Sequence, residues 1–204
     1  MKDNFILRSE FFGGYLNDCD TQEDWVLDHA TTFYLLARNR GIDNENAQAI
    51  VSAILNENQP QISYEAMEQF DKLRCCDKLS GNTIGAMIES GQRLLERILR
   101  RNYLSFPFEI SIYPSFRCNL NCDFCFINSR SKVELFGLQD WLSIISEAKN
   151  AGVTSFSILG GEPSVYPYIV PLLSHIESER IRATITMNGQ NLSDELVSFL
   201  CESK

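Results

Sequence analysis

The sequence has no long hydrophobic run of the kind that crosses a membrane. A helix that spans a bilayer needs about 20 consecutive apolar residues, and no segment of the 204 residues approaches that length. The opening residues, MKDNFILRSEFF, contain a short apolar stretch that Arg8 and Glu10 interrupt, which does not match a signal peptide. We therefore expect a cytoplasmic protein with no membrane partner, in a compartment where thiols stay reduced.

The chain is also short of positive charge. It carries 18 Lys and Arg against 27 Asp and Glu, which gives a formal net charge of −9. Residues 1–60 hold 4 basic and 10 acidic side chains. A nucleic-acid partner requires a broad basic surface, so we expect none. The apolar fraction of 44% is instead typical of a folded protein with a core.

The first part of the chain predicts a small α+β module. Two apolar segments flank Gly13 and Gly14, which predicts a β-hairpin that turns at this glycine pair. Apolar residues then recur at helical spacing over residues 21–41, with Gly41 placed to end the helix.

Two more helices are expected before the pattern changes. Asp43 is placed to cap a helix that Pro60 stops, and a third helix is expected over residues 63–76. A hairpin followed by three helices is a winged-helix-like arrangement, which we assign to residues 1–80. The next helical segment, residues 81–104, is expected to be a connector.

From residue 105 onward, strands and helices alternate. Strands are expected over residues 108–113, 153–161 and 181–188, and helices over residues 138–152, 168–179 and 193–202. Gly152 is placed to stop the first of these helices and Ser193 to cap the last. This alternation predicts a parallel sheet in an α/β domain over residues 105–204.

Three of the seven cysteines lie close together, within the motif CNLNCDFC. Cys118, Cys122 and Cys125 follow the strand at residues 108–113 directly. In a reducing compartment such a cluster more often holds a metal than a disulfide. A zinc site completed by His175 or Cys201, a set of plain thiols, and an iron–sulfur cluster with one open iron all fit this spacing.

The motif resembles the radical S-adenosylmethionine (SAM) superfamily. The cysteine spacing, the aromatic Phe124 before the last cysteine, and GGEP at the end of the next strand carry the resemblance. It implies a [4Fe-4S] cluster on Cys118, Cys122 and Cys125, with the methionyl group of SAM on the fourth iron. It also implies reductive cleavage of SAM to a 5′-deoxyadenosyl radical, which abstracts a hydrogen atom from substrate.

The same resemblance implies a set of SAM contacts at Phe124, Gly160, Gly161, Glu162, Pro163 and, in the segment Met187 to Gly189, Asn188. Glycines allow close backbone approach, and the carboxylate of Glu162 is an acceptor that suits the amine of SAM. Both motifs follow adjacent parallel strands, where α/β sheets place their ligands.

The front module is similar in layout to the RiPP recognition element of enzymes that modify ribosomally made peptides. That resemblance implies capture of the leader of a precursor peptide as an added strand. A structural cap or another recognition task would also fit the layout. Its acidity argues against DNA.

The expected architecture is a winged-helix-like module followed by the first half of a radical SAM (β/α)6 partial TIM barrel. Because only three βα units follow residue 105, we expect a truncated or split form.

The expected function is that of a radical SAM enzyme, or its N-terminal part, that modifies a precursor peptide by crosslinking, thioether formation or epimerisation. A flavodoxin or ferredoxin would supply electrons, and no catalytic residue can be assigned. Two alternatives stay open: a catalytically incomplete peptide- or partner-binding protein with a vestigial cluster loop, and a zinc-binding winged-helix regulator.

Overall fold

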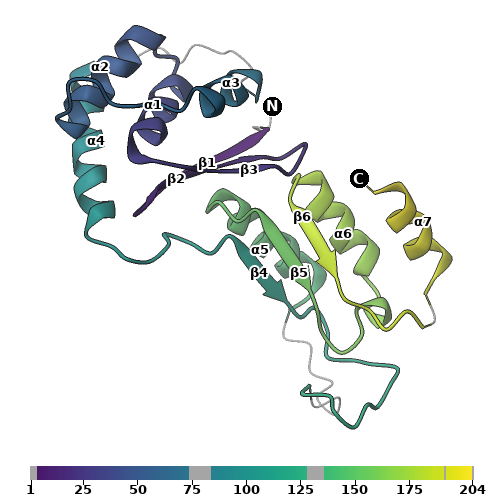
Figure 1. The fold of residues 1–204 in the computed structure, drawn as a ribbon. Coiled ribbons are helices and arrows are strands. Elements are labelled where there is room, and N and C mark those ends of the chain that lie inside the picture. The colour runs from purple at the N-terminus through teal and green to yellow at the C-terminus, as the bar shows by residue number, and fades with distance from the viewer. Residues whose placement is uncertain (1–3, 74–83, 128–135, 191, 204) are drawn as a thin grey trace. The chain divides into compact units, whose positions relative to one another are not determined.

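The computed structural model describes residues 4–73, 84–127, 136–190 and 192–203. The chain divides into two compact units, Met1–Ser105 and Phe106–Lys204 (Figure 1). Among the described residues, none of the helices has the length and hydropathy that a membrane-spanning segment requires.

The sheet of the first unit has three antiparallel strands rather than two. β1 (Phe5–Glu10) pairs with β2 (Gly13–Asp18), and β2 pairs with β3 (Asp24–Leu27). β3 lies inside the segment expected to be helical, so that expectation is wrong for its first residues. Helix α1 (His29–Asn39) begins after Asp28, whose Oδ1 accepts a hydrogen bond from the Thr31 N–H at 2.6 Å. This cap separates the strand from the helix.

The hairpin turns at residues 11–12, not at the glycine pair. Glu10 pairs with Gly13 in the β1–β2 register, so both glycines belong to β2. Gly13 has φ +133°, and a Cβ there would lie 2.1 Å from the Leu27 carbonyl oxygen. A Cβ on Gly14 would lie 2.3 Å from Oγ1 of Thr32. The glycines are therefore required because β2 passes close to the start of α1.

Three further helices complete the first unit: α2 (Asn44–Leu55), α3 (Tyr64–Leu73) and α4 (Ile84–Leu99). The expected cap at Asp43 is confirmed, since its Oδ1 accepts from the Asn46 N–H at 2.9 Å. α2 ends earlier than expected, at a left-handed Asn56, before Pro60 is reached.

α4 occupies most of the segment expected to be a connector, and it packs against α2. A Cβ on Gly91 would lie 2.3 Å from Cδ1 of Ile54, so the two helices approach closely, and Met87 and Ile98 join the core of the first unit. The final turn of the third expected helix and the break after it lie in residues 74–83, outside the described residues.

The second unit contains the expected parallel sheet. Its strands are β4 (Glu109–Ile112), β5 (Ser155–Ile158) and β6 (Arg182–Ile185), paired in that order and all parallel. The connecting helices are α5 (Leu138–Asn150), the short 3-10 helix η1 (Pro163–Val165), α6 (Ile169–Ser178) and α7 (Asp194–Glu202). The α/β architecture predicted from the sequence is confirmed.

The ends of these elements also follow the sequence. Gly152 ends α5 with φ +94°, and its N–H donates to the Lys149 carbonyl at 2.8 Å. Ser193 caps α7 through its Oγ, which accepts from the Leu196 N–H at 3.2 Å. The sheet packs against helices through a buried core that includes Ile145, Phe156, Ile158, Leu172 and Ile176. Because the strands are parallel, their carboxyl ends meet at one edge, and the loops that follow them are neighbours there.

Candidate functional site

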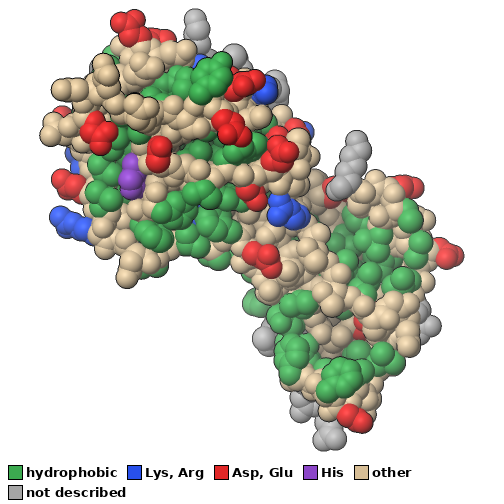
Figure 2. All heavy atoms as spheres, viewed as in Figure 1, with side chains coloured by type: hydrophobic (Ala, Val, Ile, Leu, Met, Phe, Trp, Pro, Cys, Tyr) green, Lys and Arg blue, Asp and Glu red, His purple; other side chains and the backbone are tan. Residues whose placement is uncertain are grey.

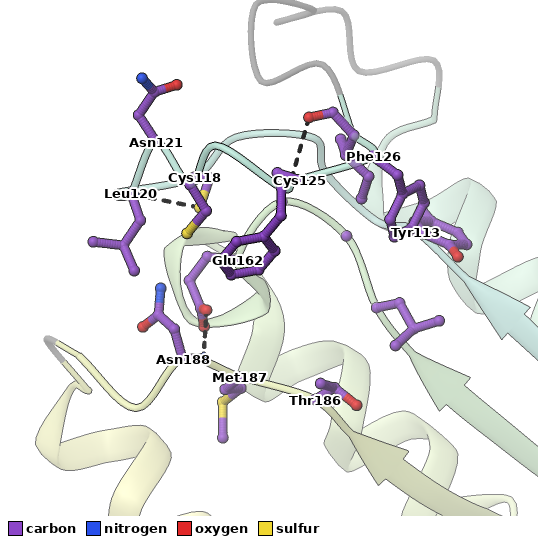
Figure 3. A pocket seen from close by; sticks show the side chains of 16 residues that line it. Tyr113, Cys118, Leu120, Asn121, Cys125, Phe126, Glu162, Thr186, Met187 and Asn188 are labelled. Atoms are coloured by element: carbon purple, nitrogen blue, oxygen red, sulfur yellow. Dashed lines mark hydrogen bonds between the residues drawn. The ribbon is translucent and has the colours of Figure 1, made fainter.

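The loop after β4 carries the three clustered cysteines. We call residues 113–127 the cysteine loop. Cys118 is half-buried, and its Sγ accepts from the Leu120 N–H at 3.4 Å; Cys122 and Cys125 are exposed. A tight turn, in which the Cys125 N–H donates to the Cys122 carbonyl at 3.1 Å, joins the last two. Figure 3 shows Cys118 and Cys125 on this loop.

The loop after β5, residues 159–162, lies against the first part of the cysteine loop; we call it the GGE turn. Its backbone N–H groups continue the pairing of the two strands: Gly161 donates to the Ser115 carbonyl at 3.1 Å and Glu162 to the Arg117 carbonyl at 2.8 Å. A Cβ on Gly161 would lie 2.3 Å from the Arg117 carbonyl oxygen. Its lack of a side chain therefore allows the two loops to approach each other.

Glu162 is the buried polar centre of the site, with only 2% of its surface exposed. Oε1 accepts hydrogen bonds from the N–H and the hydroxyl of Ser164, at 3.1 and 2.6 Å. Oε2 accepts from the Asn188 N–H at 2.7 Å. In Figure 3 this side chain lies between the cysteine loop and Asn188. A carboxylate has about four acceptor positions, so about one more donor can be accommodated.

The loop after β6, residues 186–190, forms the third side of the site; we call it the Asn188 loop. The Thr186 N–H donates to the Ile158 carbonyl at 3.1 Å, which extends the sheet pairing to this loop as well. The side chain of Asn188 donates from Nδ2 to Oδ1 of Asn119 at 2.8 Å. The loops after β4, β5 and β6 are thus joined to one another by hydrogen bonds.

The three loops line an open pocket of about 710 Å³. Of the residues expected at the site, the pocket is lined by Cys118, Cys122, Cys125, Phe124, Gly160, Gly161, Glu162 and Asn188. Pro163 does not line it and instead begins η1 as a buried residue. The sequence pattern therefore gathers nearly all of its expected residues in one place.

Sequence reasoning missed several other residues of the same pocket, including the aromatic Tyr113 and Phe126 and the polar Thr186. Tyr113 and Thr186 each follow a strand directly, so their positions at carboxyl ends of parallel strands could have indicated them. Phe124 and Phe126 are 91% and 84% exposed. Figure 2 shows hydrophobic side chains exposed at the lower end of the second unit, where Figure 1 draws the loop after β4.

Neither of the additional ligands considered for zinc lines the pocket. Nε2 of His175 lies 3.0 Å from the Ser146 hydroxyl and 3.1 Å from the Leu142 carbonyl, between α5 and α6. Cys201 is an exposed thiol on α7. Within the described part of the chain, no three His, Cys, Asp or Glu side chains are grouped to hold a single metal ion.

Residues 112–204 match the model of the Radical SAM superfamily. Over these 93 of its 204 residues, the chain is similar to the radical SAM superfamily. The matched region begins at the last residue of β4 and includes all three loops of the pocket. Members of this superfamily use a [4Fe-4S] cluster and SAM.

Solved structures of a radical SAM protein are similar to the chain over its whole length. Streptococcus suis SuiB bound to the precursor peptide SuiA shares 31% sequence identity, with a TM-score of 0.73, and the match covers 100% of this chain and 46% of SuiB. SuiB bound to SAM shares 30% identity with this chain, with a TM-score of 0.71. That match covers 100% of this chain and 45% of SuiB.

A curated relative matches a shorter part of the chain. The GTP 3′,8-cyclase of Synechococcus sp. (strain CC9902) is 37% identical over 83 residues, which are 39% of this chain and 24% of the cyclase. The chain therefore spans less than half the length of SuiB and about a quarter of the length of the cyclase.

The residues of the pocket fit the two cofactors of the superfamily. Thiolates are the usual ligands of iron–sulfur clusters, and a four-iron cluster is held at separate corners rather than around one point. Cys118, Cys122 and Cys125 all line the pocket, so three separate thiol ligands are available there. The spare acceptor position on Glu162 fits the ammonium group of an amino acid.

The buried carboxylate of Glu162 gives a direct test of this arrangement. In Glu162→Gln, an NH2 group replaces one carboxylate oxygen and faces an N–H or hydroxyl donor. We expect the free energy of unfolding of the second unit to fall by about 1–3 kcal/mol, the cost of leaving a buried donor unpaired. The free energy of unfolding is measured from Trp141 fluorescence during denaturation. A Trp25→Phe background removes the other tryptophan. Glu177→Gln, at an exposed position of α6, is the matched control, and equal stability of the two variants would contradict the assignment.

Proposed function

We propose that the second unit binds a [4Fe-4S] cluster and SAM in the pocket, as part of a radical SAM enzyme. One observation carries this proposal. A single pocket is lined by residues from the loops after two adjacent strands, namely Cys118, Cys122, Cys125 and Glu162. The three thiolates would hold the cluster. Three ligands leave one iron open for the amine and carboxylate of SAM, in line with the superfamily resemblance.

When bound, the cluster would supply one electron to SAM, whose S–C5′ bond would break to give methionine and the 5′-deoxyadenosyl radical. A flavodoxin or ferredoxin would deliver that electron. The chain's own residues position and shield the reactants. Glu162 would accept a hydrogen bond from the amine of SAM, while Gly160 and Gly161 would allow the neighbouring backbone to approach SAM closely. Phe124, exposed beside Cys125, would cover the adenine, and Pro163 would fix the direction of the chain after Glu162.

We further propose that the substrate is a ribosomally made precursor peptide. SuiB was solved with a precursor peptide, and its similarity extends over both units of this chain. The similarity to the GTP cyclase covers 39% of the chain, which supports the radical SAM chemistry and not a nucleotide substrate in particular. The reaction would be hydrogen-atom abstraction from the peptide, leading to a crosslink, a thioether or an epimerised residue.

The first unit would hold the leader of that peptide through strand addition. In the sheet order β1–β2–β3, the outer edge of β3 has no strand partner among the described residues. Three of the four β3 residues are exposed or half-exposed, and Val26 is 76% exposed. An exposed strand edge offers main-chain hydrogen bonds to an extended peptide, and side-chain contacts beside it give specificity.

Cluster binding is tested by alanine substitution of the thiols. After anaerobic reconstitution with iron and sulfide, we expect Cys118→Ala, Cys122→Ala and Cys125→Ala each to retain less than about a tenth of the iron of the wild type, because cluster ligands are lost. Cys201→Ala, an exposed cysteine in the same unit, should retain all of it.

The same samples distinguish the alternatives. Formation of 5′-deoxyadenosine after reduction of the wild type supports the enzyme, and bound iron without SAM cleavage supports a vestigial cluster loop. A protein that takes up zinc and no iron would establish the regulator and overturn the proposal.

Leader binding is tested on the exposed edge of β3. We expect Val26→Asp to weaken binding of a synthetic leader peptide by about tenfold or more, since a charge is placed where the added strand would exclude water. The peptide would be the leader of a short precursor encoded beside the gene, and affinity is measured by fluorescence anisotropy. Val197→Asp, on an exposed face of α7, is the control. Equal affinities of the two variants would reject β3 as the binding edge.

A further inference from the structure

The side chain of Asn188 is engaged by the protein itself. Its Oδ1 accepts from the Gln190 N–H at 2.9 Å, and its Nδ2 donates to Oδ1 of Asn119 at 2.8 Å. Its backbone N–H donates to Glu162 at 2.7 Å. Sequence reasoning placed Asn188 among the residues that contact SAM, but these bonds connect it to both of the other loops.

The direction of the Asn188–Asn119 hydrogen bond is fixed by its surroundings. The oxygen of the Asn188 amide is held by Gln190, so the NH2 group is the part that faces Asn119. Asn119 must therefore present its oxygen. An acceptor at residue 119 preserves the bond, and an apolar side chain there removes it.

This bond ends beside a cysteine expected to bind the cluster. Asn119 directly follows Cys118, whose Sγ is held by the Leu120 N–H at 3.4 Å. Residues 119 and 188 are 69 positions apart in the chain, so the bond joins the cysteine loop to the Asn188 loop, while Glu162 is bonded to both loops. The amide pair therefore fixes Cys118 with respect to Glu162.

We propose that Asn119 and Asn188 form an interloop bridge that positions the Cys118 thiolate and the Glu162 carboxylate for one ligand. Asn188 is then a positioning residue rather than a SAM contact. The proposal rests on the proposed function in that SAM is the ligand so positioned, whereas the bridge itself is a property of the protein without cofactors.

Three variants separate the bridge from the charge and size of its members. Asn119→Leu is similar in size and removes the acceptor. Asn119→Asp keeps an acceptor for the Asn188 NH2 group and adds a negative charge. In the double variant Asn119→Asp/Asn188→Asp both members are acceptors, so no donor is left. Asn121→Leu is the control, since it is the same change from Asn to Leu at an exposed position of the cysteine loop. Within the described residues, no hydrogen bond of the Asn121 side chain is found.

The first measurement uses cluster-free protein and needs no SAM. Alkylation by iodoacetamide, followed for each cysteine by mass spectrometry, reports how firmly Cys118 is held, with Cys201 as the internal reference. We expect the alkylation rate of Cys118 to rise about three- to tenfold in Asn119→Leu and in the double variant, because each of them loses one hydrogen bond. Asn119→Asp and Asn121→Leu should show no rise. A nearby carboxylate raises the pKa of a thiol and slows alkylation, so charge cannot cause the increase in the double variant.

The second measurement is the affinity of the reconstituted protein for SAM, by equilibrium dialysis. Asn119→Leu should bind about three- to tenfold more weakly than Asn119→Asp. If Cys118 reacts at the same rate in Asn119→Leu and Asn119→Asp, or if the two variants bind SAM equally, the bridge has no positioning role and the inference is overturned. A wild type that binds no SAM while the alkylation pattern holds would instead reject the proposed cofactor and leave the bridge standing.

Discussion

The site depends on one buried carboxylate. Glu162 donates its backbone N–H to the cysteine loop, and its two oxygens accept from Ser164 and from the backbone of Asn188. A buried charged group is costly unless its hydrogen bonds are satisfied, so these contacts fix the conformations of the loops after β4, β5 and β6 together. The same carboxylate keeps about one acceptor position for a ligand. Structure and proposed chemistry thus depend on the same side chain.

The parallel sheet explains why these particular loops meet. β4, β5 and β6 are paired in chain order, so their carboxyl ends lie at one edge, and each following loop continues the backbone pairing for a few residues. Gly161 allows the closest approach, since any side chain would collide with the Arg117 carbonyl. The shape of the pocket therefore depends mainly on backbone geometry. The cysteines and Phe124 lie on a loop whose first residues are held by backbone hydrogen bonds.

The sequence was most informative where short motifs carry chemistry. The cysteine spacing and GGEP predicted the lining of the pocket, and strand–helix alternation predicted the sheet, because each rests on local pattern. The first unit was harder. Asp24–Leu27 form a strand whose four residues are too few to show alternation, and Trp25 and Val26 fit a helical face equally well. Gly13 and Gly14 matched a turn, although their role is to let β2 pass α1. The Asn119–Asn188 bond joins distant residues and leaves no local signal.

The most direct test of the account is the electron paramagnetic resonance spectrum of the reconstituted, reduced protein, recorded with and without SAM. If the amine and carboxylate of SAM bind the open iron beside Glu162, the g-values of the reduced cluster will change when SAM is added. In Glu162→Gln with its cluster retained, that change will require a higher SAM concentration. A wild-type cluster whose spectrum is the same at every SAM concentration would contradict the assignment of this pocket.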